Sequence, residues 1–140
     1  MECRLGLIQL AAGDDKTANL QAARREIDRV VRKGAELVIL PEMFCVPYET
    51  SRFADYGEAE GGEAQQMLAA AAKENGCWLV GGSICEEENG HYYNTSYVYN
   101  PQGVCVAKHR KMHLFDIDIE GGQYFKESDV LSPGTSLTVF

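Results

Sequence analysis

The chain has 140 residues, 45% of them hydrophobic, and 13 basic against 21 acidic residues give a formal net charge of −8. This length and apolar content suit one globular domain with a core, and they exclude a disordered or fibrous protein. The acidic excess leaves no basic surface for a phosphate backbone, so we expect no nucleic acid partner.

The first half of the chain alternates strand and helix signals. Apolar runs bounded by turn residues indicate strands, and apolar residues at helical spacing indicate helices that cover a sheet. The polar turn before the first helix offers Asp15 or Thr17 as its cap. The expected elements are a strand over 4–11, a helix from near Lys16 to Gly34, a strand over 36–40 and a helix over 63–75 closed by Gly76.

The second half adds an antiparallel meander. Its strands are separated by the turn sequences EEENG and NPQG, and the polar residues that follow His113 predict no element. The expected strands cover residues 77–85, 91–99, 104–108 and the start of a further strand at 135–140. With no internal repeat or linker, residues 1–140 are interpreted as a single α/β domain with helices outside its sheets.

Neither an export signal nor a membrane span is expected. The N-terminus lacks a basic region followed by a long apolar segment, and no run approaches the roughly 18 apolar residues of a span. The five cysteines show no CxxC spacing, which indicates reduced thiols and a cytoplasmic location. Asn94-Thr95-Ser96 matches a glycosylation sequon, and without an export route we interpret it as incidental.

No cofactor or metal is expected. His109 and His113 are four residues apart, but the glutamate of a zincin helix is missing between them. Asp116 and Asp118 lack the later ligands of a calcium loop, and the glycine pairs match no nucleotide-binding motif.

Three charged positions stand among apolar or aromatic residues. In VILPEMF, Glu42 follows the apolar run 38–41 at the carboxyl end of a strand, where open α/β sheets commonly bind ligands. Lys111 lies in KHRKMHLFD and Glu127 in FKESDVLSPG. Taken singly, the three have ordinary alternatives, namely an exposed loop carboxylate, a solvated basic rim and a surface glutamate.

Several blocks together resemble one family. VILPEMF, YNTSYVYNPQGVCVAKHRKMHLFD and FKESDVLSPG are similar, in order and spacing, to blocks of the nitrilase or carbon–nitrogen hydrolase superfamily, and most of all to its ω-amidase-like branch. The resemblance runs along nearly the whole chain. It implies a nitrilase-like αββα sandwich, of which 140 residues are the N-terminal portion, truncated at about the midpoint.

The resemblance also implies a Glu-Lys-Cys triad. Glu42 matches the general base, Lys111 the cation that holds the tetrahedral oxyanion, and Glu127 a second, positioning glutamate. Glu42 and Lys111 are expected to meet in one cleft with Glu127 at its edge. A cysteine attacks an amide carbon as a thiolate, so it needs a base for its proton and a cation for the developing charge.

The nucleophilic cysteine of the family is expected beyond Phe140. Cys45, three residues after Glu42, is the alternative nucleophile. The cysteines in strand-like runs are interpreted as small core residues, namely Cys77, Cys85 and Cys105.

Two functions follow from the sequence. The first is a hydrolase of non-peptide C–N bonds in small linear amides, forming homo-oligomers through uncovered sheet surface, with residues 1–140 alone inactive. The alternative is a nucleophile-free relative that acts as a binding or assembly protein.

Overall fold

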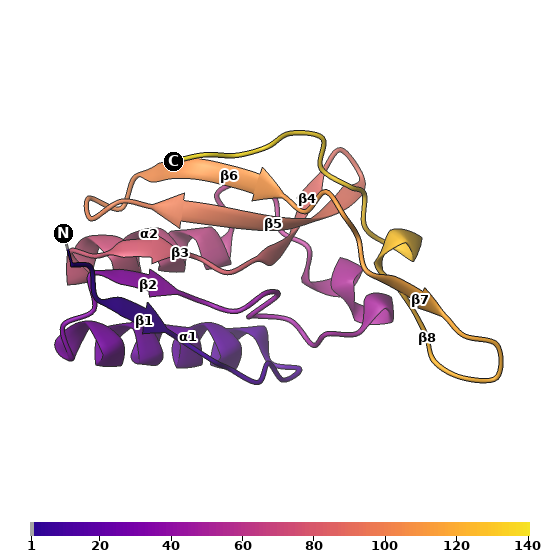
Figure 1. The fold of residues 1–140 in the computed structure, drawn as a ribbon, viewed down its shortest axis with the longest axis horizontal. Helices are drawn as coiled ribbons and strands as arrows, with labels where there is room; N and C mark the ends of the chain where they lie inside the picture. Colours follow the sequence, from indigo (N-terminus) through magenta and orange to yellow (C-terminus); the bar gives the residue numbers. More distant parts are fainter. Residues whose placement is uncertain (1) are drawn as a thin grey trace.

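The strand and helix signals become one mixed sheet, two α-helices and a separate hairpin (Figure 1). The coordinates are a computed structural model that describes residues 2–140. In chain order the elements are β1 (Leu5–Leu7), α1 (Lys16–Arg32), β2 (Leu37–Ile39), the 3₁₀ helix η1 (Thr50–Tyr56), α2 (Glu63–Asn75), β3 (Trp78–Val80), β4 (Ile84–Glu88), β5 (His91–Tyr99), β6 (Cys105–Arg110), β7 (Asp116–Asp118), β8 (Tyr124–Lys126) and the 3₁₀ turn η2 (Glu127–Asp129).

The main sheet has a parallel half and an antiparallel half. β1, β2 and β3 pair in parallel, and β3 then pairs antiparallel with β5. β5 also pairs antiparallel with β4 and with β6. Because β6 and β3 both oppose β5, β6 runs in the same direction as β2 and β3. The carboxyl ends of β2 and β6 therefore lie at the same end of the sheet as the start of β5.

Both α-helices pack on one face of the sheet. α1 contacts β1 and β2, α2 contacts β3 and β5, and the two helices contact each other (Figure 1). Side chains alternate across a strand, so Val38 and Leu79 point at the helices and are fully buried. These α and β layers correspond to one half of the αββα sandwich. Among residues 2–140, no helix combines the length and apolar character that a bilayer crossing needs.

The opposite face of the sheet is apolar and largely open. Leu7 is 72% exposed and Trp78 41%, although both lie in strands. The extended segment 133–138 crosses one side of this face next to β6, where the hydroxyl of Thr138 donates to the carbonyl of Lys108 at 3.1 Å.

The helices match their predicted limits. Asp15 caps α1 by accepting a hydrogen bond from the main-chain N–H of Ala18 at 3.0 Å, and Gly76 ends α2 in a left-handed conformation with φ +60°. The Asn89-Gly90 turn between β4 and β5 has positive φ at both residues, as a two-residue hairpin requires.

Several strand predictions were wrong in extent. The strand expected over 4–11 covers only Leu5–Leu7, and residues 135–140 form no ladder. The hairpin of β7 and β8 was not predicted, because its strands are only three residues long and half of their residues are charged. The run 77–85 divides into β3 and β4.

Gly82 explains why that run divides. It has φ +57°, a region that other residues rarely adopt, and a Cβ at this position would collide with the carbonyl oxygen of Pro41. The turn therefore brings residues 81–83 against the segment that follows β2. The main-chain N–H of Phe44 donates to the carbonyl of Ser83 at 3.2 Å and ties the two segments together.

Replacing Gly82 should destabilise the chain through this contact. Gly82→Ala adds a collision with main-chain atoms to the left-handed strain, whereas Gly121→Ala, at φ +69° in open space, adds strain alone. We expect Gly82→Ala to lower the free energy of unfolding by about 1–3 kcal/mol more than Gly121→Ala. Urea denaturation measures both, and equal losses would contradict the contact.

Self-association of residues 1–140 stays a prediction. The open apolar face and its exposed side chains favour pairing between copies of this chain. Sedimentation velocity should therefore find dimers or larger species, and Leu7→Lys with Trp78→Lys should shift the distribution toward monomer. A stable monomer at high concentration without these substitutions would contradict the expectation.

Candidate active site

Glu42 is held at the carboxyl end of β2 by a strained neighbour. Met43 has φ +51°, which is rare for a residue with a side chain, and its main-chain N–H donates to the buried Ser83 hydroxyl at 2.9 Å. Such a conformation persists only where surrounding contacts impose it. The Glu42 side chain is directed into a cleft and is 48% exposed.

Lys111 is held directly after β6. Its main-chain N–H donates to the carbonyl of Asn94 at 2.8 Å, and its own carbonyl accepts from the N–H of Gly134, also at 2.8 Å. The main chain of Lys111 is therefore bonded on both sides, to β5 and to the segment after η2.

The three predicted charged residues lie together. The Lys111 ammonium is 2.8 Å from Oε1 of Glu42 and 2.8 Å from Oε2 of Glu127. Side-chain exposure falls from 48% for Glu42 to 26% for Lys111 and 0% for Glu127. The lysine thus joins a carboxylate in the cleft to a carboxylate in the interior.

Glu127 is the innermost member of the three, so the alternative of a surface glutamate was wrong. It lies in η2, fully buried, and does not line the cleft. Its oxygens accept from the Tyr48 hydroxyl and the Phe115 N–H, each at 2.7 Å, and from Lys111. Burial raises the pKa of Glu127, but the hydrogen bonds from Lys111, Phe115 and Tyr48 outweigh it, and the net pKa lies below its ordinary value.

Lys111 remains protonated in this position. Burial lowers its pKa, and the hydrogen bonds to Glu127 and Glu42 raise it by more, so the net shift is upward. The interpretation of KHRKMHLFD as a solvated basic rim was therefore wrong for Lys111, which is a paired cation at the edge of the core.

The neighbouring cations Lys108 and Arg110 serve another carboxylate. Both ion-pair with Glu86, which is 1% exposed, and Arg110 bonds its two oxygens at 2.9 Å each. Burial raises the pKa of Glu86, but Arg110, Lys108 and Thr95 outweigh it and hold the pKa at about 2. This network fixes the end of β6 from which Lys111 emerges.

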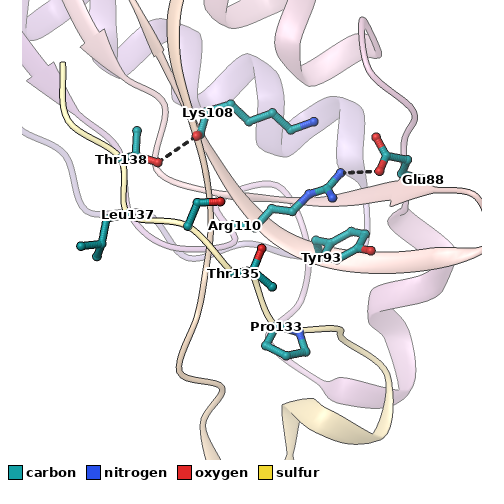
Figure 2. Close-up of a pocket in the computed structure, with 10 residues that line it drawn as sticks. Glu88, Tyr93, Lys108, Arg110, Pro133, Thr135, Leu137 and Thr138 are labelled. Atoms are coloured by element: carbon teal, nitrogen blue, oxygen red, sulfur yellow. Dashed lines mark hydrogen bonds and ion pairs between the residues drawn. The ribbon is translucent and has the colours of Figure 1, made fainter.

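A second pocket lies over these two cations. It has a volume of about 550 Å³ between β6 and residues 133–138. Figure 2 shows Arg110 directed at Glu88, and Thr138 bonded to the main chain of Lys108. Since both cations are already neutralised by glutamates, this pocket presents no free charge for a ligand.

The cleft lined by Glu42 and Lys111 contains both a carboxylate and an ammonium group. Its volume is about 620 Å³. The residues that line it come from the ends of β2, β3, β5 and β6 and from the C-terminal segment, namely Leu40, Glu42, Val80, Gly82, Ser83, Asn94, Ser96, His109, Lys111, Met112, His113 and Leu137. His109 and His113 both line the cleft, yet residues 2–140 contain no group of three His, Cys, Asp or Glu side chains arranged for a metal.

Comparison with known proteins assigns the family. The sequence profile of the carbon–nitrogen hydrolase family matches residues 4–140. The chain belongs to this family. It is 47% identical over 137 residues to the omega-amidase NIT2-B of Xenopus laevis, covering 98% of this chain and 50% of that protein. It is 49% identical over 134 residues to nitrilase homolog 2 of Dictyostelium discoideum, covering 94% and 41%.

A solved structure from the family confirms the nitrilase-like fold. A Saccharomyces cerevisiae protein from branch 10 of the nitrilase superfamily superposes with a TM-score of 0.83 at 35% identity, covering 97% of this chain and 50% of that one. The chain thus spans about half the length of the family members it matches.

Cys45 is poorly placed to act as a nucleophile. It is fully buried and absent from the cleft lining, and burial raises the pKa of its thiol to about 12. A thiol with this pKa is almost entirely protonated near neutrality and therefore unreactive. Cys85, also buried, has a pKa of about 12 for the same reason, as a small core residue would. Cys77 is buried too, but Cys105 is exposed, so its interpretation as a core residue was wrong.

Two residues at the site were not identified from the sequence as site residues. Tyr48 donates to Glu127 and stacks on Phe125 with ring centroids 5.5 Å apart, and burial raises its pKa well above the ordinary value. Asn94 donates from Nδ2 to Oε1 of Glu42 at 2.7 Å. In sequence Tyr48 is one of several aromatics, and Asn94 was interpreted only as part of a sequon.

Removing the inner charge should destabilise the chain strongly. Glu127→Gln leaves Lys111 without its buried partner, and we expect a loss of about 3–5 kcal/mol at pH 7. Glu42→Gln, in the exposed half of the same network, should cost less than about 1.5 kcal/mol. Thermal and urea unfolding compare the two.

The stability lost in Glu127→Gln should also depend on pH. Because the folded pKa of Glu127 is lowered, its charge contributes stability above the ordinary carboxyl pKa, and that contribution disappears as pH falls through the folded value. The difference between wild type and Glu127→Gln should therefore shrink in acid. A difference that grows in acid would contradict the lowered pKa.

Proposed function

We propose that this chain forms part of an amidase that hydrolyses the C–N bond of small linear amides. The observation that carries the proposal is the Lys111 ammonium between the buried Glu127 and the cleft-lining Glu42. A carboxylate and a cation 2.8 Å apart in one cleft supply the base and the charge stabilisation that thiolate attack on an amide needs.

The proposed nucleophile is a cysteine outside residues 1–140. Membership of the carbon–nitrogen hydrolase family and the coverage of about half of each relative support this assignment. None of the cysteines at positions 2–140 lines the cleft. The residues described here would then supply the base, the cation and the positioning glutamate.

The proposed reaction has two stages. Glu42 takes the thiol proton, and the thiolate attacks the amide carbon while Lys111 stabilises the negative charge that develops on oxygen. Collapse of the tetrahedral intermediate returns the proton to the nitrogen and releases ammonia, leaving a thioester. Glu42 then takes a proton from water, which attacks the thioester and releases the acid and the thiol.

Glu127 has a positioning role in this scheme. It is fully buried and contacts Lys111 but does not line the cleft. It keeps the ammonium charged and fixes its place, so that the cation is ordered before the substrate binds. Such prior ordering gives electrostatic stabilisation its value in catalysis.

The proposed substrates are ω-amides of short dicarboxylic acids. Relatives at 46–47% identity carry the name omega-amidase, and the chain covers 98% of its own length in these matches. The cleft, with a volume of about 620 Å³ and two histidines in its lining, has room for a small acid amide and imidazole N–H groups that can donate to its carboxylate.

Activity should require both the site and the missing cysteine. Residues 1–140 alone should release no ammonia from ω-amides. The chain extended by the downstream segment that carries the cysteine should release it, and Glu42→Gln or Lys111→Ala should each lower kcat by about 10²–10³. Lys33→Ala, at the exposed end of α1, is the matched control and should leave the rate unchanged.

Two outcomes would overturn this function. Ammonia release by residues 1–140 that survives Lys111→Ala but disappears in Cys45→Ala would assign the chemistry to a different site. Binding of an ω-amide by the extended chain without turnover would instead favour the alternative, a nucleophile-free binding protein.

A further inference from the structure

Asn94, the first residue of the glycosylation sequon, lies beside the cleft and has no role in the proposed mechanism so far. It lies within β5, pairs with Cys85 of β4, and is 3% exposed. A side chain so buried, with its amide nitrogen engaged, is not available to a glycosyl donor. Besides this pairing with β4, the next residue of β5, Thr95, pairs with Arg110 of β6.

Asn94 contacts both charged residues of the cleft. Its side-chain Nδ2 donates to Oε1 of Glu42 at 2.7 Å, and its main-chain carbonyl accepts the N–H of Lys111 at 2.8 Å. The two partners reach Asn94 from the ends of different strands, and the Lys111 ammonium is 2.8 Å from the same Oε1. One residue therefore bonds to both members of the pair.

These contacts divide the two oxygens of Glu42. Oε1 accepts from Lys111 at 2.8 Å, from Asn94 at 2.7 Å and, more weakly, from the Tyr48 hydroxyl at 3.3 Å. No hydrogen bond from residues 2–140 reaches Oε2. An oxygen with these donors is a poor proton acceptor, whereas its unbonded twin on a 48% exposed side chain retains its lone pairs.

We propose that Asn94 is a positioning residue of this site, which fixes Glu42 through its side chain and Lys111 through its main chain, and so reserves Oε2 of Glu42 for proton transfer. The inference rests on the proposed hydrolase function and adds to it the residue that sets the carboxylate's orientation. A carboxylate that receives a single hydrogen bond can rotate about its last bond without losing that contact. The Asn94 amide is a second donor to the same oxygen and restricts this rotation.

The proposal predicts an effect on pH dependence with a defined sign. The Asn94 amide donates a hydrogen bond to the charged carboxylate, so removing it should move the acid limb of the pH–rate profile to higher pH. The other titratable groups near Glu42 are Lys111 and Tyr48, which contact it, Glu127, which contacts both of these, and the cleft-lining His109 and His113. A substitution at Asn94 leaves all of these side chains present, so the difference between the variants reports the loss of the Asn94 donor.

The test compares three variants of the extended, cysteine-containing chain. Asn94→Ala removes the donor and keeps the main-chain carbonyl. Asn94→Asp preserves the shape but places a negative charge beside Oε1. Asn75→Ala is the matched control, because Asn75 Nδ2 also donates to a carboxylate, that of Asp28, at 2.7 Å, but at the end of α2.

We expect kcat/KM to fall about tenfold to hundredfold in Asn94→Ala, the range for a hydrogen bond to a charged group. The acid limb of its pH–rate profile should move to higher pH, further in Asn94→Asp, and not at all in Asn75→Ala. Crystal structures of Asn94→Ala or Asn94→Asp should show the Glu42 carboxylate rotated, a readout that does not depend on turnover.

The outcomes distinguish failure of the Asn94 proposal from failure of the proposed amidase function. If Glu42→Gln is as active as wild type, the proposed function fails. If Glu42→Gln is inactive but both Asn94 variants keep an unmoved acid limb and an unrotated carboxylate, the positioning role alone is overturned. Should Asn94→Ala fail to fold, Asn94→Asp decides by the same two readouts.

Discussion

The ion pair between the Lys111 ammonium and the buried carboxylate of Glu127 is the interaction on which the site depends. A fully buried charge is costly unless its oxygens are paired and hydrogen-bonded. Glu127 meets this condition through Lys111, Tyr48 and the main chain of Phe115. The carboxylate stays ionised, and the ammonium is held from the interior before anything enters the cleft. Its outward contact with Glu42 then places a fixed positive charge beside a carboxylate that the cleft can reach.

The sheet topology brings these groups together. β2 and β6 run in the same direction because β3 and β6 both oppose β5, so the residues that follow them meet at one end of the sheet although Glu42 and Lys111 are 69 positions apart. Met43 in a left-handed conformation and the close approach of Gly82 to Pro41 fix the chain after β2. Strain and close packing are thus concentrated where the cleft lies, as is common where side-chain direction matters more than local stability.

Local features of the sequence predicted the helices and the limits of β5, but not the limits of the other strands. Helical periodicity and caps act within a few residues, so both helices could be placed closely. The break in the run 77–85 could not, because it depends on the contact of Gly82 with Pro41, 41 positions earlier in the chain. Glu42 stood out through its place after an apolar run, and the family resemblance linked it to Lys111 and Glu127. The burial of Glu127 and the contacts of Asn94 arise from partners distant in sequence, which single-sequence patterns do not encode.

The sign of one pKa shift tests the central claim most directly. Burial alone would raise the carboxyl pKa of Glu127 above its ordinary 4.5, whereas the network with Lys111, Phe115 and Tyr48 lowers it. A pH titration followed by NMR of the ¹³C-labelled Glu127 carboxyl carbon measures this sign. The account predicts a midpoint below 4.5 that moves upward in Lys111→Met. A midpoint at or above 4.5 in the unsubstituted chain would show that the hydrogen bonds from Lys111, Phe115 and Tyr48 do not outweigh burial at Glu127, and would contradict the account.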